Sequence, residues 1–186
     1  MSYLKEKYQK EVIPGMKEKF GYKNIFQAPK ITKVVLNTGF GRMATSLSGQ
    51  ELEKTVDSII QDMGLISGQK PVKTKAKKAI SAFKIRKGMV IGAKVTLRKT
   101  KMYDFMERLI NVALPRTRDF RGLERKTVDR DGNLTIGIKE HTVFPEVSPE
   151  KAKSIFGLEI AVSTTAKSRE EGLELLTRMG FPIKPE

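Results

Sequence analysis

The chain has 186 residues, with 36 Lys or Arg side chains against 21 Asp or Glu, and a net charge of +15 at neutral pH. Hydrophobic residues make up 39% of it, enough for one core, so we expect a single domain over residues 1–186. The absence of cysteine excludes disulfides and thiolate metal sites, and one histidine, His141, cannot supply a set of imidazole ligands. Nothing in the sequence identifies a nucleophile or an orienting partner that would make His141 a general base. We therefore expect no enzyme, no metal site and no cofactor.

The chain also shows no membrane signal. No apolar run approaches the roughly 20 residues that cross a bilayer. Residues 1–10 lack the apolar region of a signal peptide. We expect a cytoplasmic protein with no membrane partner.

Two helices are predicted in the first third of the chain. The first covers residues 3–20; Pro14 should bend it or end it early, and Gly21 should stop it. The second has apolar residues on one face and should end at Gly64. The residues that define the two apolar faces are Leu4, Tyr8, Val12, Met16, and Leu52, Val56, Ile59, Ile60, Met63.

Between these helices, residues 31–37 are predicted to form a strand with Asn37 facing outward. Gly39, Gly41 and Ala44 follow, and they match the loose pattern of a dinucleotide-binding turn. That pattern needs a helix beginning within the turn, whereas the next helix is predicted only after Ser48. A nucleotide-dependent enzyme is therefore the weaker alternative.

The second half of the chain alternates further strands and helices. A helix is predicted from about Lys101 until Pro115 closes it, and another should follow a capping box at Ser168 and Glu171. Strands with a period of two are predicted at residues 91–98, 133–138 and 158–163. Strands with one apolar face, mixed with amphipathic helices, indicate an α+β fold: a mainly antiparallel sheet with helices on one face and the other face open.

Positive charge is concentrated in one segment. Between Met63 and Tyr103 there are twelve Lys or Arg residues and no Asp or Glu. Such an uncompensated run favours a polyanionic partner, above all nucleic acid. The competing interpretation is a solvated lysine-rich loop.

Three regions are candidates for contact with RNA. Residues 69–88 are a predicted basic loop that includes Phe83, on which an unpaired base could stack. The outward sheet face offers amide, hydroxyl and cationic groups, although an ordinary wet sheet face would look the same. A third cluster follows Pro115, and its mixed charge fits protein contact as well as RNA contact. The sheet-face residues are Asn37, Lys94, Thr96 and Arg98.

A series of motifs in order along nearly the whole chain resembles the family of bacterial large-subunit ribosomal protein five (uL5), the 5S rRNA-binding protein of the central protuberance. The motifs are SGQKP at 67–71, TKAKK at 74–78, FKIR at 83–86, IGAKVTLR at 91–98, RLI at 108–110, LPR at 114–116, RDFRG at 118–122, FPE at 144–146, TTA at 164–166 and GFP at 180–182. Lys77 or Lys78 stands where many relatives have an arginine, which keeps phosphate attraction but loses the planar fork.

The resemblance implies a structural constituent of the large ribosomal subunit, cytoplasmic and ribosome-bound. It implies 5S rRNA on the open sheet face, with Asn37, Gln69 and Thr96 matching family positions that contact this RNA; we add Lys94 and Arg98 from the strand pattern. It also implies a basic loop at about 73–87 that meets peptidyl-site tRNA. The candidate residues of that loop are Lys73, Lys75, Lys77, Lys78, Ser81 and Phe83.

The same resemblance implies a bridge to a protein of the small-subunit head, for which Arg116, Arg118 and Arg121 are our candidates. Further partners would be 23S rRNA and neighbouring central-protuberance proteins. The main alternative is a general cationic RNA-binding protein or RNA chaperone without 5S specificity.

Overall fold

An open sheet of five antiparallel strands, in the order β2-β3-β1-β5-β4, forms the centre of the fold. The computed structural model describes residues 3–47, 49–148, 150 and 154–185. The strands are β1 Ile31–Gly39, β2 Val72–Lys75, β3 Val90–Leu97, β4 Leu134–Ile138 and β5 Leu158–Thr164. The predicted α+β class with a mainly antiparallel sheet is therefore confirmed.

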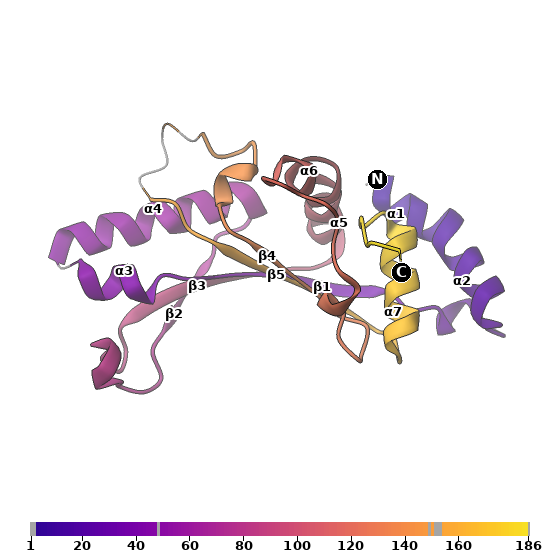
Figure 1. The fold of residues 1–186 in the computed structure, drawn as a ribbon, viewed down its shortest axis with the longest axis horizontal. Helices are drawn as coiled ribbons and strands as arrows, with labels where there is room; N and C mark the ends of the chain where they lie inside the picture. Colours follow the sequence, from indigo (N-terminus) through magenta and orange to yellow (C-terminus); the bar gives the residue numbers. More distant parts are fainter. Residues whose placement is uncertain (1–2, 48, 149, 151–153, 186) are drawn as a thin grey trace. The chain divides into compact units, whose positions relative to one another are not determined.

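Helical segments occupy both ends of the chain and the stretches between strands (Figure 1). The α-helices are α1 Tyr3–Lys7, α2 Ile13–Phe20, α3 Gly41–Ser46, α4 Gly49–Ser67, α5 Lys99–Arg108, α6 Leu114–Arg116 and α7 Arg169–Met179. Short 3-10 turns are η2 Ile25–Gln27, η3 Ser81–Phe83, η5 Arg125–Thr127 and η6 His141–Val143, and π-helical segments are η1 Tyr8–Val12 and η4 Leu109–Ala113. In the described part of the chain, no helix has the length and apolar character to span a membrane.

Both π-helical segments end just before a proline. Pro14 lies in the first turn of α2 and Pro115 in the first turn of α6, where a missing backbone N–H is tolerated. The helical conformation therefore continues past each proline, and the prediction that Pro115 closes its helix is wrong by one residue, because α6 ends at Arg116. Gly21 ends α2 as predicted, with a φ of 67°.

The chain divides into two compact units. The first comprises Met1–Val34, Leu97–Ile136 and Ala161–Glu186; the second comprises Val35–Thr96 and Gly137–Ile160. Strands β1, β4 and β5, and β3 through its last residue Leu97, contribute residues to both units. The single domain expected from the sequence stays a prediction.

The first unit contains the helices from both ends of the chain. Its core includes Met16 of α2, Phe105 of α5 and Leu176 of α7, none of them exposed to solvent. Ser168 caps α7 by accepting a hydrogen bond from the Glu171 backbone N–H (3.3 Å), as the capping-box pattern predicted. Glu174 of α7 accepts hydrogen bonds from Lys19 and from Arg178, both at 2.6 Å, which ties α7 to α2.

The second unit has α4 along one face of its strands (Figure 1). The buried residues of α4 are Val56, Ile59, Met63, Ile66 and Ser67. Because Ile66 continues the apolar stripe, the helix runs through Gly64 and ends at Ser67, with Gly68 in the left-handed conformation (φ 65°) just after it. The predicted stop at Gly64 was therefore one helical turn too early.

A short helix, α3, begins at Gly41 directly after β1. The prediction that no helix begins before Ser48 was therefore wrong. The sheet remains antiparallel, so the turn lacks the parallel strand that a dinucleotide-binding unit requires.

Candidate nucleic-acid interface

The face of the sheet opposite α4 carries polar side chains at alternate positions of β1 and β3. On β1, Leu36 and Thr38 are buried and Asn37 is exposed; on β3, Val95 is buried and Lys94 is exposed. Thr96 is half-buried on the same face as Lys94. The strand period thus places an amide, an ammonium and a hydroxyl on neighbouring strands, as predicted.

Gln69 joins this group through a hydrogen bond to β3. Its side-chain Nε2 donates to the backbone carbonyl of Thr96 at 3.3 Å, across 27 residues of sequence. The structure therefore brings together Gln69 and Thr96, two residues that the family resemblance had selected separately.

Ser67 holds the backbone of Gln69 in place. The single proton of this buried hydroxyl lies within donating distance of two carbonyls, those of Met63 (2.7 Å) and Gln69 (2.8 Å), and its oxygen accepts from the Gln69 N–H (3.3 Å). The sequence analysis missed Ser67. Its position next to Gly68, at the end of an amphipathic helix, is a signal from which a capping role could have been predicted.

Asn37 also has a partner that the sequence did not indicate. Its Nδ2 donates to Glu159 Oε2 on β5 at 3.3 Å. Both side chains are exposed. Because the NH₂ group of the Asn37 amide faces the Glu159 carboxylate, the amide oxygen points away from it. That oxygen can accept a hydrogen bond from a partner.

Arg98 belongs to the first unit and is described apart from the others. It is exposed, and its Nη1 donates to the Thr32 carbonyl at 3.5 Å. Its guanidinium is thus held beside β1 by one weak bond and retains further N–H donors.

The predicted basic loop is a hairpin whose two arms are hydrogen-bonded. Beyond β2 and β3, Ala76 pairs with Met89 and Gly88 at 2.8 and 2.9 Å, and Ile80 pairs with Ile85 at 2.9 and 3.1 Å. The segment 69–88 therefore begins with β2 and continues as a loop whose two arms are joined by backbone hydrogen bonds, and the expected basic loop is present.

Most tRNA-contact candidates lie on this hairpin and are exposed: Lys75, Lys77, Lys78, Ser81 and Phe83. The Phe83 ring, in the η3 turn at the tip, is 66% exposed. Lys73 differs, because its Nζ donates to Asp57 of α4 at 2.8 Å. Lys73 therefore points to the helix side of the sheet, where its charge is paired with that of Asp57. The charges of Lys75, Lys77 and Lys78 are exposed to solvent.

Arg116, the last residue of α6, and Arg118 and Arg121, on the segment that follows, are exposed in the first unit. Thr117 begins this segment by donating from Oγ1 to the Ala113 carbonyl at 3.1 Å, and Asp119 has a φ of 55°. Leu123 ends it with backbone bonds to Pro182 and Lys184 at 2.7 and 2.9 Å. The three guanidinium groups therefore lie on a short, tethered turn.

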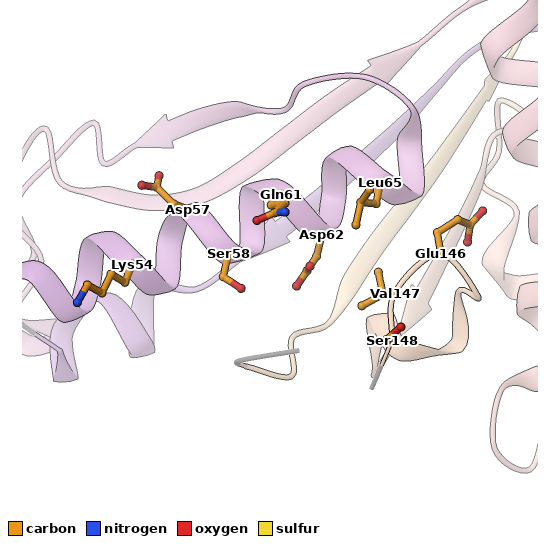
Figure 2. A pocket seen from close by; sticks show the side chains of 9 residues that line it. All are labelled: Lys54, Asp57, Ser58, Gln61, Asp62, Leu65, Glu146, Val147 and Ser148. Atoms are coloured by element: carbon orange, nitrogen blue, oxygen red, sulfur yellow. The ribbon is translucent and has the colours of Figure 1, made fainter. Parts of the chain in front are cut away.

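A recess of about 540 Å³ lies on the helix side of the second unit, between α4 and residues 146–148 (Figure 2). Asp57, Asp62 and Glu146 line it together with a single cation, Lys54. This lining repels phosphates, so the recess is a poor site for nucleic acid.

His141 lies behind that recess as a buried structural residue. Its ring stacks on Phe156 (centroids 3.9 Å apart), its Nδ1 accepts from the Phe156 N–H at 3.4 Å, and its Nε2 is 3.6 Å from Asp62 Oδ2. Burial lowers the pKa of His141 and raises that of Asp62. Within the described residues there is no cluster of three or more metal-ligating side chains.

Comparison with known proteins agrees with these features. Residues 24–86 match the family model described as ribosomal protein L5, and residues 90–183 match the model of the C-terminus of the same ribosomal protein family. Three curated proteins named large ribosomal subunit protein uL5 are similar along almost their whole length. The protein of Desulforapulum autotrophicum is 52% identical over 184 residues (99% of each chain), that of Clostridium tetani 51% over 180 residues (97% of each), and that of Syntrophomonas wolfei 50% over 184 residues (99% of this chain and 100% of the relative).

Matches of this extent identify the family of the whole chain and the class of its function. The open antiparallel sheet and the concentration of positive charge are consistent with a protein that works on RNA. The chain therefore belongs to the L5 family of ribosomal proteins, and it is a structural, non-enzymatic component of the large subunit of the cytoplasmic ribosome.

Proposed function

We propose that this protein attaches 5S rRNA to the large subunit through the open face of its second unit. The observation that carries the proposal is the 3.3 Å hydrogen bond from Gln69 Nε2 to the Thr96 backbone carbonyl, which holds the Gln69 side chain against β3 next to the Thr96 and Lys94 positions. Donors at fixed positions suit the shallow A-form surface, where sugar hydroxyls and phosphates are the accessible groups.

The test is equilibrium binding of the full chain to labelled 5S rRNA at moderate salt, with excess bulk tRNA and duplex DNA as competitors. The 5S complex should persist, because binding by charge alone fades under these conditions. Equal displacement by all competitors would instead identify a general cationic RNA-binding protein, which is the alternative function.

Single substitutions then test whether the open sheet face is the binding site. Thr96→Val and Asn37→Ala should each weaken 5S rRNA binding by roughly 2- to 10-fold, the effect of losing one hydrogen bond. Asn111→Ala is the matched control, because Asn111 is an exposed amide in η4 of the other unit. Parental affinity in both test variants would refute the assignment of the sheet face without affecting the family.

The basic hairpin is our proposed contact to peptidyl-site tRNA. Its exposed cations Lys75, Lys77 and Lys78, with Ser81 and Phe83 at the tip, offer phosphate contacts and one ring for stacking. Ribosomes that carry Lys77→Ala and Lys78→Ala should hold peptidyl-site tRNA less tightly while 5S rRNA content stays unchanged. Unchanged tRNA affinity would exclude this role.

The bridge to the small-subunit head is proposed at Arg116, Arg118 and Arg121. Their exposure on a tethered turn supports contact with an acidic protein surface. Substituting all three with Glu should raise the Mg²⁺ concentration needed for the subunits to join. Joining at the parental Mg²⁺ concentration would move the bridge elsewhere.

A further inference from the structure

The most exposed large apolar side chain of the described residues is an aromatic ring that none of the proposed contacts uses. Phe26, in the η2 turn of the first unit, is 93% exposed, and its neighbour Ile25 is 56% exposed. A solvent-exposed ring forgoes most of the stabilisation that burial of a Phe side chain provides. Such a ring is a candidate contact for a partner.

The η2 turn is built rigidly. Asn24 Oδ1 accepts from the Phe26 N–H at 3.0 Å, and Gln27 Oε1 accepts from the backbone N–H groups of Lys23 (3.0 Å) and Asn24 (3.5 Å). This reciprocal capping box is an arrangement that usually begins a longer helix, yet here it stabilises only three residues. The ring is therefore displayed by a preformed support, which reduces the entropy lost on binding.

The turn is also anchored to the helices of its unit. Ala28 and Pro29, directly after it, are buried, and Tyr8 Oη donates to the Pro29 carbonyl at 3.1 Å. Burial of Tyr8 and, to a smaller extent, the electrostatic effect of Tyr103 raise the pKa of the Tyr8 hydroxyl to about 12, so this donor keeps its proton. The exposed ring thus stands on a fixed base.

The charge along the chain on both sides of the turn favours a polyanion. No Asp or Glu occurs between Glu18 and Glu51, and the turn is flanked by the exposed cations Lys23 and Lys30. Because both capping amides use their oxygens inside the turn, their NH₂ groups remain as hydrogen-bond donors beside the ring. Exposed ring, cations and amide donors together suit an unpaired nucleotide, whose base stacks, whose edge accepts hydrogen bonds and whose phosphates are negative.

We propose that Phe26 stacks on an unpaired base of ribosomal RNA, with Lys23 and Lys30 at the flanking phosphates. The proposal rests on the protein's working on ribosomal RNA, and it adds a contact in the first unit that is independent of the sheet face. An apolar pocket on a neighbouring protein is the competing occupant, but it would gain nothing from the cations or the two amide donors.

The first test is ultraviolet crosslinking of the full chain to refolded 5S and 23S rRNA, each used separately. After RNA and protein digestion, mass spectrometry should find a nucleotide adduct on Phe26 in the tryptic peptide 24–30, with at least one of the two RNAs. Absence of the adduct with both RNAs, while adducts form elsewhere on the chain, would overturn the proposal.

The second test measures affinity for the same RNAs. Phe26→Leu keeps apolar bulk but removes the ring, so it should weaken binding to the crosslinked RNA about tenfold, the effect of losing one stacked base. Phe26→Trp should retain affinity, and Ile155→Ala, which truncates another exposed apolar side chain (63% exposed) in the second unit, should leave it unchanged.

These results separate the inference from the proposed function. If Phe26→Leu binds both RNAs like the parent while Thr96→Val loses 5S rRNA, the stacking proposal fails and the sheet-face proposal stands. If Phe26→Leu binds normally and Phe26→Ala is poorly incorporated into subunits, the ring docks on a protein, which also overturns the proposal. The melting temperature should match the parent in every Phe26 variant, since the ring contacts solvent.

Discussion

The close approach of three strands at Gly92 provides a sharp test of the sheet that supports the interface. A Cβ atom added to Gly92 of β3 would lie 2.6 Å from the Thr38 carbonyl oxygen of β1 and 2.7 Å from Thr74 Oγ1 of β2. Both distances are below 3.0 Å, a separation that Cβ atoms essentially never show. The first contact is with backbone, so Gly92→Ala requires β1 and β3 to separate or to shift along each other.

Overpacking of this kind destabilises proteins by about 1–3 kcal/mol. For a chain of this size, each 1 kcal/mol lowers the melting temperature by roughly 2–4 °C. Gly92→Ala should therefore melt about 2–12 °C below the parent in a thermal scan followed by circular dichroism. The displacement also passes through Thr38 to the adjacent Asn37, so 5S rRNA affinity measured below the melting transition should fall as well.

Gly39→Ala is the matched control. Gly39 is a strand glycine at the end of β1 with nothing within 4 Å of its added Cβ, so alanine there meets no atom and reduces the freedom of the unfolded chain. Its stability should equal or slightly exceed that of the parent, with unchanged RNA binding. If Gly92→Ala were as stable as Gly39→Ala, the three strands would not approach each other as closely as the structure indicates.

Three further outcomes are expected. Lys75→Ala should lower the slope of log K for RNA against log salt by roughly 0.7–0.9, the value for one lost phosphate contact, in a salt titration. Ser67→Ala should lower the free energy of unfolding by about 1–3 kcal/mol, and it should weaken 5S rRNA binding because Gln69 loses its support. The control Ser46→Ala removes an exposed hydroxyl bonded to a helix carbonyl, and it should change neither stability nor RNA binding. Burial lowers the pKa of His141, so below the ordinary value of 6.5 the unfolded chain binds more protons than the folded one. The free energy of unfolding measured by urea titration should therefore fall as the pH drops below this value. His141→Phe should not show that loss.

Alternation predicted four of the five strands because its signal is local, but it missed the short β2, which lies in the segment expected to be a loop. Alternation of apolar and polar residues decides which face each side chain takes, and Asn37 and Lys94 are exposed as that alternation requires. Helix ends were harder to predict, since a glycine stops a helix only where tertiary packing no longer extends it. Ile66 is fully buried, and this burial carries α4 three residues beyond Gly64.

Side-chain pairing could not be predicted, because it depends on strand register. In the pairing of β2 with β3, Lys73 lies opposite Ala93 and Thr74 opposite Gly92, so Lys73 shares a face with Ala93 and meets Asp57 of α4. A shift of one residue would have sent Lys73 to the open face. Nothing local distinguishes Lys73 from Lys75, and the basic run therefore looked uniform in the sequence.

Charge in the second unit is divided between the two sides of its sheet. The carboxylates of α4, among them Asp57 and Asp62, lie on the helix side, where Asp57 neutralises Lys73 and the acidic recess repels phosphate. On the open side, Lys94 is exposed and Glu159 keeps its negative charge while it accepts a hydrogen bond from Asn37, but the exposed cations Lys77 and Lys78 of the hairpin add positive charge to this unit. A polyanion that approaches this unit is repelled by one face and attracted by the other, and the field acts over about a Debye length, 8–10 Å, before any contact forms. If 5S rRNA binds as we propose, its orientation precedes recognition: the charge distribution favours the open face, and the polar groups at fixed positions on that face then discriminate between RNAs.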